Sequence, residues 1–125
     1  MNLTKLQAWY SHKQGLDGSL AKASAASVLA QTGWARSVGG VGPYLTLVSR
    51  AGIGREAADA SVAQLDIYEL PAVRNCTYVV PASHFALALR AGQSHWAAGQ
   101  MRAALKLGVT DKEIDQLCET DRKSV

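Results

Sequence analysis

The segment Gly52–Pro81 changes its hydrophobic period part of the way along, and this change constrains the fold more than any other feature of the sequence. Its first half, Arg55–Asp66, has the spacing of an amphipathic helix. The apolar residues Ala58, Val62 and Leu65 recur there at i, i+4 and i+7, so they share one helical face. We therefore expect a helix that packs one side against a core.

Beyond this helix the period shortens to two, which is the period of a β-strand. Two short runs, Ile67–Leu70 and Cys76–Val80, are rich in Val, Ile, Thr and Tyr. Pro71 and Asn75 stand between the runs and favour a turn. The sequence therefore predicts a mainly helical fold with a small β-hairpin, a winged-helix domain in which a helix-turn-helix is followed by a wing.

Capping residues, glycines and apolar spacing predict further helices on both sides of this segment. Their expected bounds are Leu3–Gln14, Ser24–Thr32, Tyr44–Arg50, Ser83–Gly92 and His95–Leu107, followed by a last helix from Thr110. The side chains expected to face the core are Val28, Leu29, Trp34, Tyr44, Leu47, Val48, Phe85, Ala88, Leu89, Trp96, Ala103, Leu107, Ile114, Leu117 and Cys118. The sharpest local signal is Thr110–Glu113, a capping box in which the threonine hydroxyl and the glutamate carboxylate each accept from a free backbone N–H group.

The length of 125 residues fits one domain, and a chain of this size can bury roughly two-thirds of the surface that it exposes when unfolded. We therefore expect residues 1–125 to form a single winged-helix domain. The apolar fraction of 48% and the charged fraction of 18% favour an ordered globular protein. The formal net charge of +3 is compatible with an anionic partner but also with many ordinary proteins.

The first residues carry Lys5, His12 and Lys13 among their apolar residues and lack the apolar run of a signal peptide. No stretch approaches the roughly 20 apolar residues that span a bilayer, so we expect a cytoplasmic protein with no membrane partner. Cys76 and Cys118 lack a CxxC spacing and are expected to be buried, reduced thiols.

The motifs of cofactor and metal sites are absent. Gly39, Gly40 and Gly42 are not followed by GK[ST], and Leu45 stands where G-x-G-x-x-G requires glycine, so a hinge is favoured over a phosphate loop. The three histidines form no metal-ligand spacing. We expect no metal and no cofactor. A Ser-His-Asp or Cys-His site depends on partners that meet only in space, and no G-x-S-x-G motif supports one.

Acidic side chains cluster around the helix of the central segment: they are Glu56, Asp59, Asp66 and Glu69. A general base could be one of them, but a solvated acidic face is favoured. A helix in the major groove usually offers Arg, Lys, Asn or Gln, so this helix is poorly suited to reading bases. The arginines are scattered, and Arg74, near the hairpin turn, is the best candidate for a phosphate contact.

The succession from Gly33 to Leu89, and above all the run RNCTYVVP from Arg74 to Pro81, resembles the AlkZ-like (YcaQ-like) winged-helix DNA glycosylases. The run is similar to the family's R-G-T-L-H-L-V-P segment and keeps Arg74, Val80 and Pro81. The resemblance implies a bacterial DNA-repair protein. It also implies that the chain corresponds to the N-terminal portion of a longer protein with tandem winged-helix units.

Family members excise alkylated or crosslinked purines by hydrolysing the N-glycosidic bond, with a Q-x-Q or related motif as the catalytic element. The corresponding region here, Gly33–Val38, contains no glutamine, and the nearest one, Gln31, stands alone. Tyr78 stands where the family segment has histidine. The resemblance therefore transfers no catalytic residue to this chain.

Three hypotheses follow. The first is a domain that binds duplex DNA through its phosphates, with the candidate contact residues Arg74, Arg36, Arg50, Arg55, Asn75 and Tyr78. The second is a non-catalytic protein-interaction or scaffolding module whose partner is another protein or a second copy of the chain. The third, an active glycosylase on alkylated purines, has the least support because the catalytic motif is missing.

Overall fold

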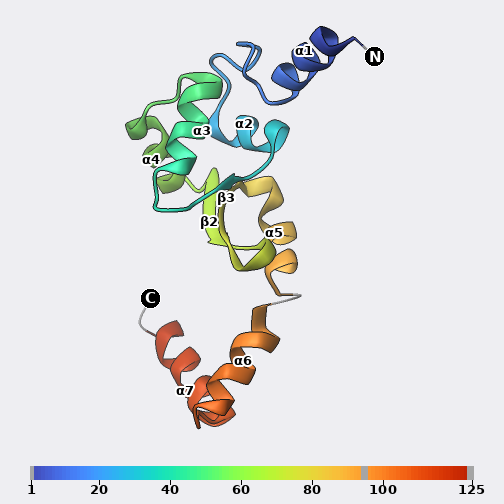
Figure 1. Cartoon of the computed structure of the whole chain (residues 1–125). Coiled ribbons are helices and arrows are strands. Elements are labelled where there is room, and N and C mark those ends of the chain that lie inside the picture. The colour runs from blue at the N-terminus through green and yellow to red at the C-terminus, as the bar shows by residue number, and fades with distance from the viewer. Residues whose placement is uncertain (1, 94–95, 124–125) are drawn as a thin grey trace.

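The chain is mainly helical with one small antiparallel sheet (Figure 1). The computed structural model describes residues 2–93 and 96–123. The helices of these residues are α1 (Leu3–Lys13), α2 (Ala25–Thr32), α3 (Gly42–Ala51), α4 (Arg55–Ala63), α5 (Phe85–Gln93), α6 (Trp96–Lys106) and α7 (Asp111–Arg122). The strands are β1 (Ala35–Arg36), β2 (Ile67–Pro71) and β3 (Thr77–Pro81), and the short 3₁₀ turns are η1 (Val73–Asn75) and η2 (Ala82–His84).

The order α2, β1, α3, α4, β2, β3 is that of a winged-helix domain, with the turn between β2 and β3 as the wing. In the sheet, β3 lies between β1 and β2 and is antiparallel to both. This arrangement confirms the predicted fold class and the predicted hairpin. β1 was not predicted from the sequence, because this two-residue strand exists only through its pairing with β3. Ala35 pairs with Val79, and Arg36 pairs with Tyr78.

Alternation along the strands gives the sheet two different faces. We call the first the three-helix face, defined by Ala35, Ile67, Glu69 and Val79. Three of these residues are buried in one core cluster with residues of α2, α3 and α4, which include Val28, Leu29, Leu47 and Ala58. Glu69 is exposed.

We call the second the α5 face, defined by Arg36, Tyr68, Leu70, Tyr78 and Val80. Leu70 and Val80 are buried in a smaller cluster with Ala72 of the turn and Ala88 of α5. The rings of Trp34, Tyr68 and Tyr78 are partly buried against this cluster.

Gly92 allows α5 to approach the hairpin closely. A Cβ atom at this position would lie 2.8 Å from the carbonyl oxygen of Pro71 and 3.4 Å from the Cα atom of Ala72. The prediction that Gly92 ends the helix is wrong, because α5 continues to Gln93. This glycine is required for packing rather than for a helix stop.

Most of the local capping signals are confirmed. The Ser24 hydroxyl accepts from the Ser27 N–H, and the Thr110–Glu113 capping box forms in both directions. Gly15 follows α1 with φ +66°, in the left-handed region that favours glycine. Pro43 lies in the first turn of α3. The backbone N–H of Thr110 holds the pKa of the Glu113 carboxyl below its usual value, since it donates to the ionised form.

Several predicted core positions are wrong. The exposed ones are Val48, Val62, Leu65, Phe85, Leu89, Ala103, Leu107, Leu117 and Cys118. Leu65 lies beyond the end of α4 with φ 61°, so it leaves the helical face that its spacing predicted. Among the described residues α7 buries none. Ser94 and His95, the predicted start of α6, and the predicted core side chain of Trp96 lie outside the described part of the structure.

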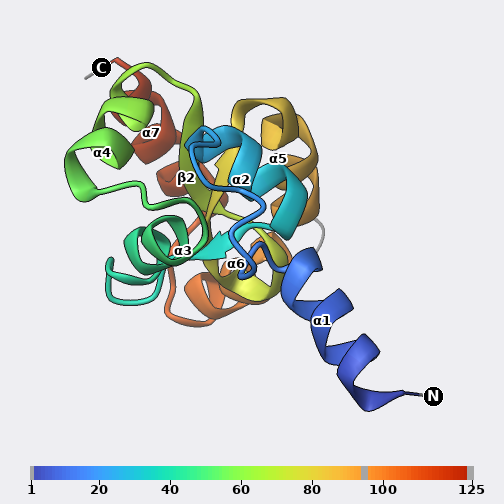
Figure 2. The same ribbon diagram turned by 90° about the horizontal axis from the view of Figure 1, so that it is seen from above.

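Helix α1 extends away from the rest of the chain (Figure 2). Its apolar side chains are exposed, and they are Leu3, Leu6, Trp9 and Tyr10. Both cysteines are free, as predicted, but Cys76 is half-buried and Cys118 is exposed. None of the helices in the described residues is long and apolar enough to cross a membrane.

Candidate nucleic-acid interface

Arg74 lies in the turn that joins β2 to β3 and has a left-handed backbone, with φ 57° and ψ 34°. This conformation costs a residue with a Cβ atom roughly 1–2 kcal/mol, so glycine or asparagine is usual there. Arg74 is exposed, and no described residue forms an ion pair or hydrogen bond with its guanidinium group. The turn therefore presents an uncompensated positive charge to solvent.

Arg36 in β1 lies close to this turn. Its Nη2 atom donates to the Sγ atom of Cys76 at 3.0 Å, and the same thiol lies 3.5 Å from the carbonyl oxygen of Arg74. Cys76 therefore links β1 to the turn, a role that the sequence analysis did not predict because β1 itself was missed. Arg36 is exposed and forms no ion pair with a described acidic residue.

Tyr78 is the strand partner of Arg36, and its half-buried ring is supported by other aromatic rings. The ring of Trp34 meets it edge to face, with centroids 6.2 Å apart and an interplanar angle of 64°. The Nε1 atom of Trp34 donates to the Nδ1 atom of His84 at 3.1 Å, which requires that Nδ1 carries no proton. Trp34 and His84 thus hold Tyr78 in place.

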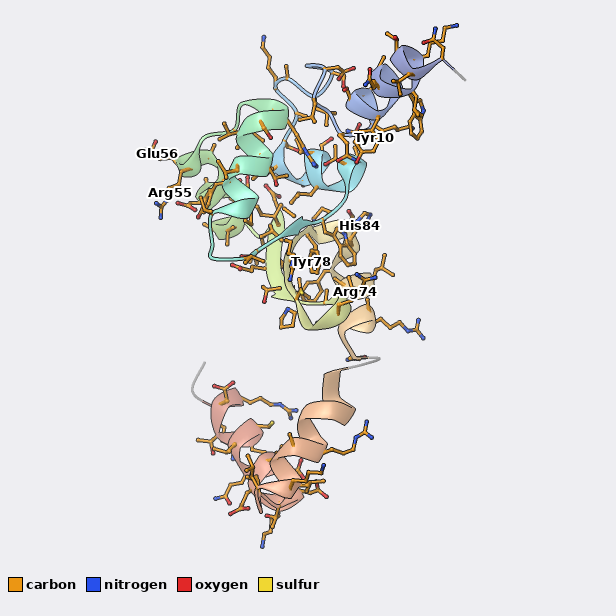
Figure 3. The ribbon with its side chains drawn as sticks, viewed as in Figure 1. Tyr10, Arg55, Glu56, Arg74, Tyr78 and His84 are labelled. Carbon is orange, nitrogen blue, oxygen red and sulfur yellow. The ribbon has the colours of Figure 1, made fainter. Side chains whose placement is uncertain are left out.

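We call the group Arg36, Arg74 and Tyr78 the wing surface. Tyr78, Arg74 and His84 lie on one side of the molecule (Figure 3). Three of the six predicted contact residues therefore come together here. Asn75 follows Arg74 in the turn, but its side chain lies outside the described part of the structure.

Arg50 lies elsewhere and is used inside the fold. Its half-buried guanidinium group donates to the Thr32 hydroxyl, and its Nη2 atom donates to Gln14 Oε1 at 3.1 Å. These bonds join the ends of α1, α2 and α3. These hydrogen bonds give Arg50 a structural role within the fold, which is an alternative to the predicted contact with DNA.

Arg55, the first residue of α4, lies on the other side of the molecule from Arg74 (Figure 3). Its Nε atom is 3.7 Å from Asp59 Oδ2, and its guanidinium carbon lies 5.4 Å from the centre of the Tyr44 ring. The Tyr44 hydroxyl donates to Asp59 Oδ1 at 2.5 Å, and this bond raises the pKa of Tyr44 because ionisation would place two negative charges together. The charge of Arg55 is therefore largely balanced within this group.

Gln31, the glutamine nearest to the region Gly33–Val38, is exposed on α2. The Gln31 side chain donates to Ser27 Oγ at 2.8 Å on an exposed side of α2. The described residues contain no group of three His, Cys, Asp or Glu side chains that could hold a metal ion.

Comparison with known proteins gives one informative result. The structure is similar to the Streptomyces sahachiroi DNA glycosylase AlkZ, with a TM-score of 0.67 and 24% sequence identity. The match covers 90% of this chain and 30% of that chain. No protein-family model matches the sequence, and no curated protein matches it significantly by sequence. The predicted resemblance to AlkZ-like proteins is thus confirmed at the level of the fold, over about a third of the length of AlkZ.

Proposed function

We propose that this chain is a DNA-binding winged-helix domain of a bacterial, cytoplasmic DNA-repair protein, and that it contacts the phosphates of duplex DNA through the wing surface. The observation that carries the proposal is the pair of exposed arginines, Arg36 and Arg74, joined through Cys76 and free of acidic partners among the described residues. Phosphate contacts by arginine fix a protein on DNA without selecting a sequence. The similarity to AlkZ supports DNA as the partner.

The backbone of Arg74 allows a test that separates binding from folding. Arg74→Gly removes the side chain and suits the left-handed φ, so the variant should unfold at the same temperature as the parent or slightly above it. If the arginine contacts a phosphate, affinity for a labelled 20-base-pair duplex should fall about fivefold to tenfold, and the slope of log K against log salt should change by roughly 0.9.

Lys22→Gly is the matched control. Lys22 is an exposed residue of the loop between α1 and α2, and its φ of 70° places it in the same left-handed region. The two variants therefore lose the same charge and relieve the same backbone conformation. Lys22→Gly should leave the affinity within about twofold of the parent. Equal losses in both variants would show that net charge, not the wing surface, governs binding.

The resemblance to AlkZ-like proteins also brings base excision into consideration as an activity. That activity is outside the proposal for this chain alone, because the region of the family's Q-x-Q motif forms β1 and presents Arg36 on the α5 face. Incubation of the purified chain with DNA that contains alkylated purines checks this point. Release of free alkylated base would assign the chain a catalytic role.

A second candidate function, a protein-interaction module, is favoured by exposed leucines just after α6 and on α7. Leu107 is 84% exposed and Leu117 is 69% exposed. Monomeric proteins rarely expose large contiguous apolar patches. Sedimentation that shows a strict monomer, together with no binding of a hydrophobic dye, would count against this function.

A further inference from the structure

A cavity of about 470 Å³ opens at the three-helix face, on the opposite side of the sheet from the wing surface. It lies between the glycine turn after β1, helices α3 and α4, and the strands β2 and β3. Cavities of about 300–1,000 Å³ are the size that binds small molecules. No residue of the wing surface lines this cavity.

The floor of the cavity is apolar. Leu47, Ile67 and Val79 line it, and each is at least nine-tenths buried. Val41 of the glycine turn and Val62 of α4 also line it, and both are exposed. A ligand with an apolar body can therefore rest on core side chains and contact the two valines.

Some polar side chains that line the cavity have partners within the protein, and one has none among the described residues. Arg55, Asp59 and Tyr44 satisfy one another through the ion pair, the hydrogen bond and the cation–π contact described above. Glu69 also lines the cavity, because it alternates with Ile67 along β2 and pairs across the sheet with Val79. No described residue forms an ion pair or hydrogen bond with Glu69.

We propose that this cavity binds a small organic cation with an apolar body, and that Glu69 contacts the cationic group. The formal charge of the lining residues is −1, since one arginine stands against two carboxylates. A carboxylate beside an apolar floor favours a cation over a neutral or anionic molecule of the same shape, because water screens the charge less there than in bulk solution. Arg55 does not offset this preference, since its guanidinium group already pairs with Asp59 and lies over the Tyr44 ring.

The test uses 2-phenylethylammonium as the probe and 3-phenylpropionate as its charge-reversed counterpart. In ¹H–¹⁵N spectra of the whole chain, the cation should shift the amides of Gly40, Glu69 and Val79, with a Kd on the order of 1 mM for so small a molecule. The anion should bind at least about tenfold more weakly. Equal binding of both probes, or no shift at these amides with 20 mM cation, would overturn the proposal.

The variant Glu69→Gln tests whether Glu69 is the residue that contacts the cationic group. This exposed, nearly isosteric change should weaken binding of the cation about tenfold and remove the preference over the anion. Asp66→Asn is the matched control, because Asp66 is an exposed carboxylate next to β2 that does not line the cavity. If Asp66→Asn weakens the cation as much as Glu69→Gln does, general attraction to an acidic surface explains the binding. Loss of DNA binding by the wing surface would not affect this result.

Discussion

The two faces of the small sheet carry opposite kinds of charge. Beside the three-helix face, Glu69 lacks a partner among the described residues, and Arg55 is paired with Asp59. On the other side, Arg36 and Arg74 carry positive charge without an acidic partner in the described chain. A sheet of three short strands thus separates the cavity that we propose binds a cation from the surface that we propose contacts phosphates.

In our proposal the charge of the side chains, rather than position in the fold, indicates which element contacts DNA. Helix α4 directly precedes the hairpin, where winged-helix and helix-turn-helix domains usually place the helix that enters the major groove. Here α4 carries Glu56 and Asp59, and its arginine is held by one of these acids. The charge of the side chains moves the expected contact from the helix to the turn.

The largest effect is expected from a substitution that disrupts the core of the three-helix face. Leu47 is 1% exposed in the middle of α3, so Leu47→Ala should lower the free energy of unfolding by about 3 kcal/mol. Leu45→Ala on the same helix, where the side chain is 61% exposed, should change it by less than about 0.5 kcal/mol. Urea denaturation measures both, and similar losses would show that α3 does not pack as described.

The next effect concerns the α5 face. Gly92→Ala forces α5 away from the backbone of Pro71 and should cost about 2 kcal/mol of stability. Gly99 in α6 has no atom within 4 Å of an added Cβ, so Gly99→Ala should instead stabilise its helix by up to about 1 kcal/mol. Thermal unfolding of the two variants gives the comparison. A neutral Gly92→Ala would contradict the close approach of α5 to the hairpin.

A smaller effect, on duplex affinity, is expected to differ between the arginines of the two faces. Arg36→Gln keeps a donor for the Cys76 thiol but removes the charge, and it should weaken duplex binding about fivefold at 100 mM salt. Arg55→Gln removes the same charge from α4 and should change affinity less than about twofold. Fluorescence anisotropy with a labelled duplex measures both. A larger loss for Arg55→Gln would reverse the assignment of the two faces.

The smallest expected effect is also informative. Glu56→Lys adds two units of positive charge to an exposed position of α4, on the other side of the molecule from Arg74 (Figure 3). At 150 mM salt, charges more than about 8 Å apart are largely screened, so duplex affinity should change by less than about twofold. Tightening by an order of magnitude would place α4 against DNA.

The sequence predicted the elements whose signals are local. The capping residues Ser24 and Thr110 and the two strands of the hairpin are confirmed because each depends on neighbours within a few positions. β1 was missed because a two-residue strand has no period of its own and forms only by pairing with β3. Helical spacing also failed for Val62 and Leu117, since spacing gives the face of a helix but not whether another element covers it.

The candidate site was predicted in part for the same reason. Arg74 could be placed at the turn from the proline and asparagine around it. Its link to Arg36 through Cys76 spans 40 residues and depends on the missed strand. The internal bonds of Arg50 and the cavity around Glu69 likewise depend on contacts between distant helices, which no pattern within the sequence specifies.

The most direct test of the central claim is an amide chemical-shift map of the whole chain during titration with an unmodified DNA duplex at low salt. Contact through the wing surface predicts the largest shifts at Arg36, Arg74 and Tyr78, with small shifts throughout α4. Shifts concentrated in Arg55–Ala63, with an unperturbed turn between β2 and β3, would contradict the account and return the binding role to the helix.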